Sequence, residues 1–182
     1  MARDGTAASR LIAAAMAALS DGAHDFEMLA VAKRAGVSVG LAYYHFGAKA
    51  GLLSAVTQCF LNELEQQALF ADVPDEGCWA TREKKRLERY VHFYYAHPIG
   101  SLMLHWPARP EEVMAVEREH EEKVLAASAS NFAQAQQQEQ ITTRLAPALL
   151  AVMTLGAVRL GVAEAMRQTP RPDAQNLVDS IW

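Results

Sequence analysis

Hydrogen-bonding side chains gather in one short stretch of this 182-residue chain, between Ser38 and Lys49. Tyr43 and His45 offer a hydroxyl and an imidazole, and Lys49 adds an ammonium group at the expected start of a helix. The first turn of a helix has backbone N–H groups without intrahelical partners, and phosphate oxygens accept from them and from side-chain donors. The stretch therefore predicts contact with phosphate groups.

Three expected helices position this stretch. Apolar residues at helical spacing predict helices over 7–20 and 28–35, and Gly36 can take the positive φ that the following turn needs. Ser38 is the expected N-cap of a third, short helix that ends before Gly47. Two short helices joined by a glycine turn are typical of a helix-turn-helix, whose second helix fits the major groove of DNA.

The rest of the chain is predicted to be helical too. Its composition favours helix over strand, and prolines mark the joints between helices. The apolar stretch Leu145–Met166 is expected to be buried on more than one side. The predicted fold is all-α, with a three-helix DNA-binding domain over 1–48 and a helical ligand-binding and dimerisation domain over 49–182. Its expected helices cover 49–70 (the connector), 80–96, 99–105, 111–140, 145–166 and 173–182.

Bulk properties narrow the class of protein. The formal net charge of −4 argues against a protein that coats nucleic acid by charge alone. Cys59 and Cys78 form no metal-binding or disulfide pattern, which suits a reducing cytoplasm. No signal-peptide layout is present, and no apolar run is judged long enough to cross a bilayer. A cytoplasmic protein without a metal, a cofactor or a membrane partner is expected.

Residues 35–53, AGVSVGLAYYHFGAKAGLL, resemble the DNA-reading signature of the TetR family of repressors. The resemblance extends over roughly the first third of the chain. It implies an all-helical homodimer that binds a palindromic operator and releases it when a small effector enters the C-terminal domain and moves the connector helix. The matching positions are Gly36, Ser38, Gly40, Tyr43, His45, Phe46, Lys49 and Leu52, with Leu11, Ala15 and Gly22 upstream.

DNA contacts are assigned from this pattern and from side-chain chemistry. Leu41 is the expected base reader, because its methyl groups suit a thymine methyl. Ser38, Val39, Ala42 and Tyr44 are expected on the exposed side of the same helix. Positive charge is expected from flanking residues, and the phosphate contacts from Tyr43 and His45. The flanking cations are Lys33, Arg34 and Lys49, with Arg3 and Arg10 further away.

The chain departs from the family pattern at two positions. Glu27 stands where the family usually has Ser or Thr at the cap of the second helix, and a carboxylate there would repel phosphate. Leu41 replaces the Thr that the family favours in the reading helix. Residues 35–48 also contain no Lys or Arg, so an unusual operator or comparatively weak binding is expected.

An aromatic group in the second half allows two interpretations. Trp79, Trp106 and the run Tyr90, Phe93, Tyr94 and Tyr95 are typical of an ordinary core, but also of an apolar pocket with polar tips. A mainly apolar, aromatic or amphipathic effector is expected, and a strongly anionic one is disfavoured because no buried Arg or Lys is evident. The expected lining residues are Leu87, Tyr90, Val91, Tyr94, Met103, Trp106, Met114 and Val152.

The expected dimer interface lies on the apolar stretch 145–166 and the terminal helix, where small residues allow close helix approach. Its residues are Leu149, Val152, Gly156, Leu160 and Ala163.

Three alternatives remain at this stage. A constitutive DNA-binding regulator would lack ligand control, and a helical enzyme or ligand carrier would use the aromatic body as its active part. Enzyme function is not expected, since no nucleophile–base pair is visible. The histidines His92, His97, His105 and His120, with Glu117 and Glu121, could be imagined as a metal site but match no recognised ligand motif.

Overall fold

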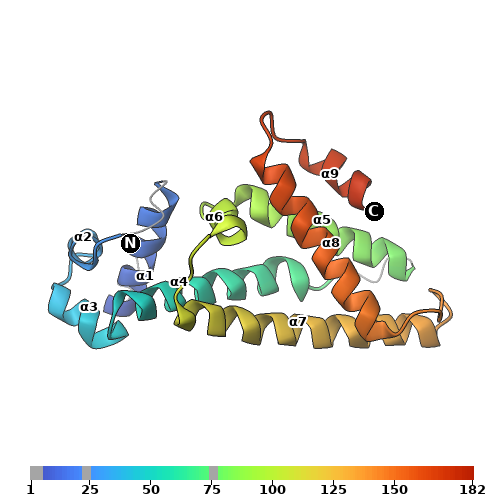
Figure 1. Ribbon diagram of the computed structural model, residues 1–182, viewed down its shortest axis with the longest axis horizontal. Helices are drawn as coiled ribbons and strands as arrows, with labels where there is room; N and C mark the ends of the chain where they lie inside the picture. The colour runs from blue at the N-terminus through green and yellow to red at the C-terminus, as the bar shows by residue number, and fades with distance from the viewer. Residues whose placement is uncertain (1–5, 22–25, 74–77) are drawn as a thin grey trace. The chain divides into compact units, whose positions relative to one another are not determined.

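The computed structural model of the chain describes residues 6–21, 26–73 and 78–182. These residues form helices and no strand, so the all-α prediction is confirmed (Figure 1). Most helix bounds agree with the sequence pattern to within one or two residues. The elements are α1 (Ala7–Ser20), α2 (Met28–Arg34), α3 (Val39–Phe46), α4 (Lys49–Leu64), the π-helical turn η1 (Glu65–Leu69), α5 (Trp79–Ala96), α6 (Gly100–His105), α7 (Glu111–Gln137), α8 (Pro147–Arg167) and α9 (Ala174–Ile181).

The chain packs as two compact units. The first contains the chain up to Leu61 together with His105–Arg118, and the second contains Asn62–Leu104 and Glu119–Trp182. Both α4 and α7 therefore contribute residues to each unit. This division follows packing alone, and the functional boundary after residue 48 stays a prediction.

The first unit has an apolar core shared by α1, α2, α3 and the start of α4. Leu11, Val31, Ala42 and Leu52 are at most 1% exposed, and together they join these four helices. Local signals set the helix ends. Thr6 caps α1 by accepting from the backbone N–H of Ser9, and caps of this kind satisfy donors that a helix start leaves open.

The junction between α3 and α4 depends on two glycines. Gly47 ends α3 with a φ of 69°, in the left-handed region that side chains disfavour. Gly51 lies on α4 so close to the end of α3 that an added Cβ would be 2.1 Å from the carbonyl oxygen of Phe46. The absence of a side chain at Gly51 therefore lets α4 pack directly against the end of α3.

The second unit is held by α5, which packs against η1, α8 and α9. An ion pair of 2.8 Å between Lys84 and Asp179 joins α5 to α9. Glu65 in η1 accepts from His120 (3.0 Å) and from Lys123 (2.5 Å) on α7. Burial raises the pKa of Glu65, but these hydrogen bonds outweigh it and the net pKa is lowered, so the carboxylate stays ionised.

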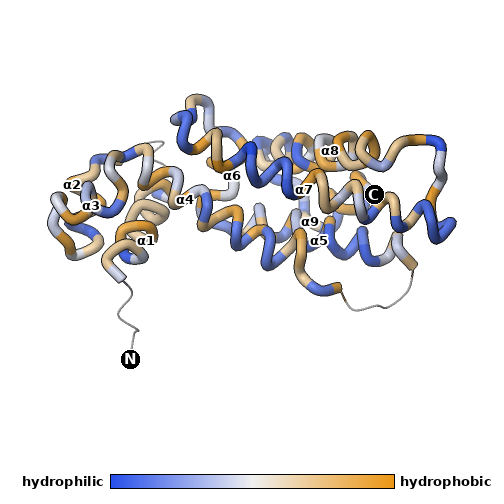
Figure 2. The backbone as a smooth tube through the Cα atoms, turned by 90° about the horizontal axis from the view of Figure 1, so that it is seen from below, coloured by the Kyte–Doolittle hydropathy of each residue, from blue (hydrophilic) through white to orange (hydrophobic). Residues whose placement is uncertain are grey.

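The apolar helix α8 corrects two sequence expectations. Figure 2 shows several hydrophobic residues along this helix. Only Ala151, Val162 and Ala165 are buried, whereas Leu160 is 72% and Met153 55% exposed, so burial on more than one side is wrong for a single chain. By length and composition α8 is also apolar enough to cross a membrane, contrary to the expectation from the sequence. The helices that pack against α8, mainly α5 and α9, are too few to cover it on all sides.

We expect Gly51→Ala to lower the free energy of unfolding by about 1–3 kcal/mol, because the new methyl group forces α3 and α4 apart. Gly40→Ala is the matched control. Its added Cβ would have no neighbour nearer than Ser38 Oγ at 4.0 Å, and alanine favours a helix. Urea unfolding followed by circular dichroism measures both variants, and equal midpoints would contradict the close approach at Gly51.

Candidate DNA-binding helix and ligand cavity

Helix α3 begins at Ser38 and presents a short recognition surface. The Ser38 hydroxyl accepts a hydrogen bond of 3.2 Å from the backbone N–H of Leu41, which confirms the predicted N-cap. Gly36, with a φ of 67°, makes the turn between α2 and α3. The two helices and their turn form the expected helix-turn-helix, and local cap and turn chemistry accounts for it.

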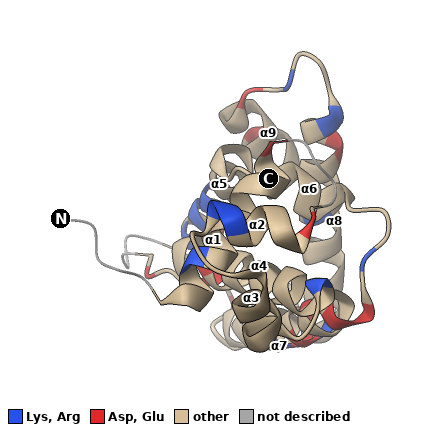
Figure 3. Ribbon diagram, turned by 90° about the vertical axis from the view of Figure 1, so that its left-hand side faces the viewer, with Lys and Arg blue, Asp and Glu red and all other residues tan. Residues whose placement is uncertain are grey.

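The exposed face of α3 is polar and aromatic but uncharged. Tyr44 is 83% and Tyr43 49% exposed, and His45 is exposed beside them, with its ring 5.5 Å from that of Tyr44. No Lys, Arg, Asp or Glu lies on α3, which is tan throughout in Figure 3. This face of α3 thus has hydroxyl and imidazole groups exposed, while Val39 and Leu41 are partly buried at the N-terminal end of the helix.

Ala42 is a correction to the predicted set of base readers. Its side chain is 0% exposed and forms part of the core of the first unit. A surface helix of eight residues buries one side against the core, and Ala42 lies on that side of α3. It therefore supports the recognition helix from behind and cannot reach a base.

The cations around α3 differ in their availability. Lys33 and Arg10 are exposed, and Lys49 is partly buried. Arg34 is exposed but pairs with Asp21 at 3.0 Å, so part of its charge is already compensated. Arg3 and Gly22 lie outside the described residues. The described cations of this unit near α3 thus lie on α1, α2 and α4, beside an uncharged α3.

Glu27 occupies the N-cap position of α2, as the sequence pattern predicted. Its backbone is extended, with φ −91° and ψ 132°, and its exposed side chain makes no capping hydrogen bond. Ser, Thr, Asp and Asn, with shorter side chains, are the residues preferred for this bond. The Glu27 carboxylate therefore adds negative charge at the start of α2 without capping a backbone N–H.

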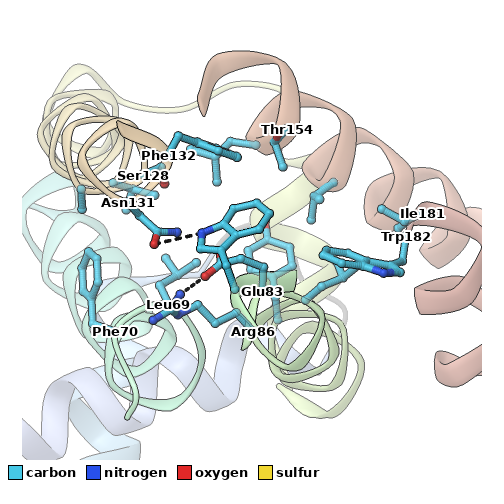
Figure 4. Close-up of a pocket in the computed structure, with 17 residues that line it drawn as sticks. Leu69, Phe70, Glu83, Arg86, Ser128, Asn131, Phe132, Thr154, Ile181 and Trp182 are labelled. Carbon is cyan, nitrogen blue, oxygen red and sulfur yellow. Dashed lines mark hydrogen bonds and ion pairs between the residues drawn. The ribbon is translucent and has the colours of Figure 1, made fainter. Parts of the chain in front are cut away.

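The second unit contains a partly open cavity of about 550 Å³ between η1, α5, α7, α8 and the C-terminal residues (Figure 4). Most of its wall is apolar, as is usual for small-molecule sites of this size. Figure 4 places Phe70 at one side and Ile181 and Trp182 at the other. The lining residues are Leu69, Phe70, Trp79, Glu83, Arg86, Leu87, Tyr90, Val124, Ala127, Ser128, Asn131, Phe132, Thr154, Leu155, Val158, Ile181 and Trp182.

Polar groups in the wall are few and specifically bonded. Trp79 donates its indole N–H to Asn131 Oδ1 at 3.2 Å, and Arg86 donates to Glu83. Burial, followed by the neighbouring Tyr94, raises the pKa of Tyr90 well above its ordinary value. Tyr90 therefore remains a neutral phenol at the cavity wall.

The structure distributes the predicted ligand residues unevenly. Leu87 and Tyr90 line the cavity. Val91, Tyr94 and Met103 are buried elsewhere in the second unit, and Val152 is exposed on α8. Trp106 and Met114 belong to the first unit. The ligand site was predicted between the helix of Tyr90 and Tyr94, the turn 103–106 and the helix 145–166. The turn 103–106 does not line the cavity, so this part of the prediction is wrong for the cavity.

The residues that sequence reasoning missed come from α7 and the chain end. Asn131 and Phe132 follow the charged part of α7, and Trp182 is the last residue. Phe132 and Trp182 are aromatic residues in otherwise polar stretches of the sequence, and this pattern could have indicated a buried role for them. The sequence showed no evident buried Arg or Lys for the lining, and the structure places Arg86, whose side chain is 32% exposed, in the cavity wall.

The histidines considered for a metal site lie in different surroundings. His120 contacts Glu65 at 3.0 Å, and His97 lies 3.5 Å from Glu63. Burial lowers the pKa of His97, although Glu63 opposes this shift. Across the described ranges, no three His, Cys, Asp or Glu side chains gather in a way that could hold a metal ion.

The chain is similar to known regulators in its sequence motif and in its fold. Residues 11–56 match the family described as "Bacterial regulatory proteins, tetR family". No curated protein matches the chain by sequence. Its fold is similar to that of the transcriptional regulator FadR from Bacillus subtilis in complex with stearoyl-CoA, with 18% identity, a TM-score of 0.75 and coverage of 95% of this chain and 94% of that one. A transcriptional regulator of the TetR/AcrR family from Thermobifida fusca has 17% identity and a TM-score of 0.75, with coverage of 97% of this chain and 94% of that one. AibR in complex with isovaleryl coenzyme A and operator DNA has 18% identity and a TM-score of 0.67, with coverage of 96% of this chain and 95% of that one.

A helix-turn-helix head followed by a helical body defines the class of protein as a DNA-binding transcriptional regulator. Within that class, residues 11–56 match the tetR family, and the described residues share their fold with a solved regulator of the TetR/AcrR family. The predicted resemblance is therefore confirmed.

We expect Glu27→Thr to tighten DNA binding by on the order of 1 kcal/mol, since a charge repulsion is removed and a hydroxyl that donates to phosphate is added. The same hydroxyl can cap α2. Glu27→Ala is the control, because it removes the charge without adding the hydroxyl and should produce only part of the gain. Fluorescence anisotropy on a duplex selected from random-sequence DNA measures both. Unchanged or weaker binding by both variants would show that Glu27 faces away from the DNA.

Proposed function

We propose that the protein is a cytoplasmic homodimeric repressor that leaves a pseudo-palindromic operator when a small, mainly apolar effector enters the cavity of the second unit. The observation that carries this proposal is the partly open, aromatic cavity in a chain whose residues 11–56, in the other unit, match the tetR family. An effector shifts such an equilibrium only by preferring one of the two conformations.

DNA recognition is assigned to the exposed face of α3 and the adjoining end of α4. Tyr43, His45 and Lys49 are proposed to contact phosphates and to position the helix. Leu41 and Tyr44, with Ser38 and Val39, are proposed to read bases. Lys33 and Arg34 add a modest electrostatic attraction, so the salt dependence of binding is expected to be shallow.

Dimerisation is assigned to the uncovered face of α8. Leu149, Val152 and Leu160 are 46%, 55% and 72% exposed, and they lie on one apolar helix with Gly156 and Ala163. An exposed apolar surface of this kind is typical of a protein interface. A two-fold axis through this face would cover it with the same helix of a second chain.

Ligand control is supported by the cavity and by two similar structures. FadR is described in complex with stearoyl-CoA, and AibR in complex with isovaleryl coenzyme A and operator DNA. Their identity to this chain is 18%, so the chemistry of the effector here must come from the cavity itself. Its aromatic wall favours a compact apolar or amphipathic molecule.

Selection of bound duplexes from random-sequence DNA by the purified full chain tests the DNA-binding part of the proposal. We expect enriched sequences with two inverted half-sites whose centres lie one or more helical turns apart, at roughly 34–36 Å for each turn. Enrichment of single half-sites, or none at all, would contradict a dimeric operator-binding protein.

Two variants then separate positioning from reading on the enriched duplex. Lys49→Ala should weaken binding to all duplexes alike and reduce the salt slope by about one. Leu41→Ala should relax the preference at one base position, with a loss of about 1–3 kcal/mol on the selected sequence only. Equal losses on selected and random DNA for both variants would remove Leu41 from the readers.

Gly156→Arg is expected to produce monomers, because the long charged side chain would project into the partner helix. A Cβ at Gly156 would meet nothing within 4 Å, so the single chain has room for it and should keep its fold. Gln134→Arg, which places arginine on an exposed position of α7, is the control. Light scattering at micromolar concentration measures both, and a dimeric Gly156→Arg protein would contradict this face.

A further inference from the structure

The charged groups of the cavity neutralise each other. Glu83 and Arg86 both line it and form an ion pair one turn apart on α5, with side chains that are 19% and 32% exposed. Among the lining residues that the structure describes, Arg86 is the one cation and Glu83 the one carboxylate. The charged side chains of the described wall therefore compensate each other.

Hydrogen-bond donors nevertheless remain unused near the Glu83–Arg86 pair. A guanidinium has five N–H groups and accepts no hydrogen bond, and Arg86 Nε is buried without a partner. The indole of Trp79 can only donate, so Asn131 must turn its oxygen toward Trp79, and its amide nitrogen is left to donate elsewhere. The unused hydrogen-bonding groups of Arg86 and Asn131 are thus donors, and a ligand would have to supply an acceptor.

The donors Arg86, Ser128 and Asn131 lie together on one side of the cavity. Figure 4 places Arg86, Ser128 and Asn131 on the side of Phe70, away from Ile181 and Trp182. Aromatic side chains surround the space between them: Phe70, Trp79, Tyr90, Phe132 and Trp182. A flat apolar body with one oxygen at its end matches this arrangement.

From these observations we infer that the cavity selects a neutral aromatic molecule with one carbonyl oxygen, and that Glu83 excludes the corresponding carboxylate. A carbonyl oxygen accepts from Arg86 and Asn131 and needs no counter-charge. A carboxylate would compete with Glu83 for the same guanidinium and leave one buried negative charge unpaired. Glu83 is thus a specificity-determining residue. The inference names the effector class for the proposed regulatory function and rests on it for its biological role only.

Two probes of the same shape test the inference. 2-Acetylnaphthalene and 2-naphthoate differ by a methyl group against a carboxylate oxygen. Isothermal titration at pH 7.5 on the full-length protein should show at least tenfold tighter binding of the ketone. Equal affinity, tighter binding of the acid, or no binding of the ketone up to its solubility limit would overturn the inference.

Glu83→Gln isolates the role of the carboxylate. It frees the charge of Arg86, so the affinity for 2-naphthoate should rise at least tenfold while that for the ketone stays within threefold. Glu88→Gln is the matched control, because it makes the same charge change on α5 outside the cavity wall and should alter neither affinity. Melting temperatures confirm folding of both variants. An unchanged ketone-to-acid ratio in folded Glu83→Gln would overturn the role of Glu83.

A third variant and a DNA assay complete the design. Asn131→Leu removes a donor and should weaken binding of the ketone about threefold to tenfold, whereas unchanged binding would overturn the assignment of the acceptor site. The DNA assay adds 2-acetylnaphthalene to the complex with the selected duplex. Binding of the ketone without release of DNA would refute the proposed effector-controlled repression and leave the ligand selectivity standing. Release of DNA by 2-naphthoate but not by the ketone would refute the ligand selectivity and leave the proposed effector-controlled repression standing.

Discussion

Helix α8 has apolar side chains on every side, but one chain covers only a strip of it, at Ala151, Val162 and Ala165. The same side of the helix, at Thr154, Leu155 and Val158, forms part of the cavity wall. The second unit therefore depends on one helix that borders the cavity on one side and is uncovered on the other. Apolar surface of this extent exposed to water favours association, and a ligand against the opposite side is in a position to influence it.

The first unit solves a different problem, which is to present a rigid short helix. An isolated helix of eight residues is not stable in water, so α3 must be held from both ends and from behind. Ser38 holds its start, Gly47 and Gly51 allow the close junction with α4 at its end, and the buried Ala42 ties it to the core. This support leaves the aromatic and hydroxyl groups of Tyr43 and Tyr44 free to face outward.

Charge is used sparingly at both sites. The recognition helix is uncharged, with its cations on the neighbouring α2 and α4, and Arg34 shares its charge with Asp21. In the cavity, Arg86 is compensated by Glu83. Under the proposed function, selectivity at both sites would rest mainly on short-range hydrogen bonds and shape, because opposite charges held close together leave little long-range field.

Helix bounds and the recognition motif followed from the sequence by itself, because caps, glycine turns and prolines act over three or four residues. Ser38, Gly36 and Gly47 have the predicted roles, and Pro147 begins α8 as expected. The cavity was decided only by the tertiary structure, since its wall combines residues from Leu69 to Trp182 and no local pattern reports such distances. For the same reason Ala42 and the aromatic residues Trp106 and Tyr94 were misplaced: helical periodicity identifies a face, but only packing decides whether that face meets the core, a cavity or water.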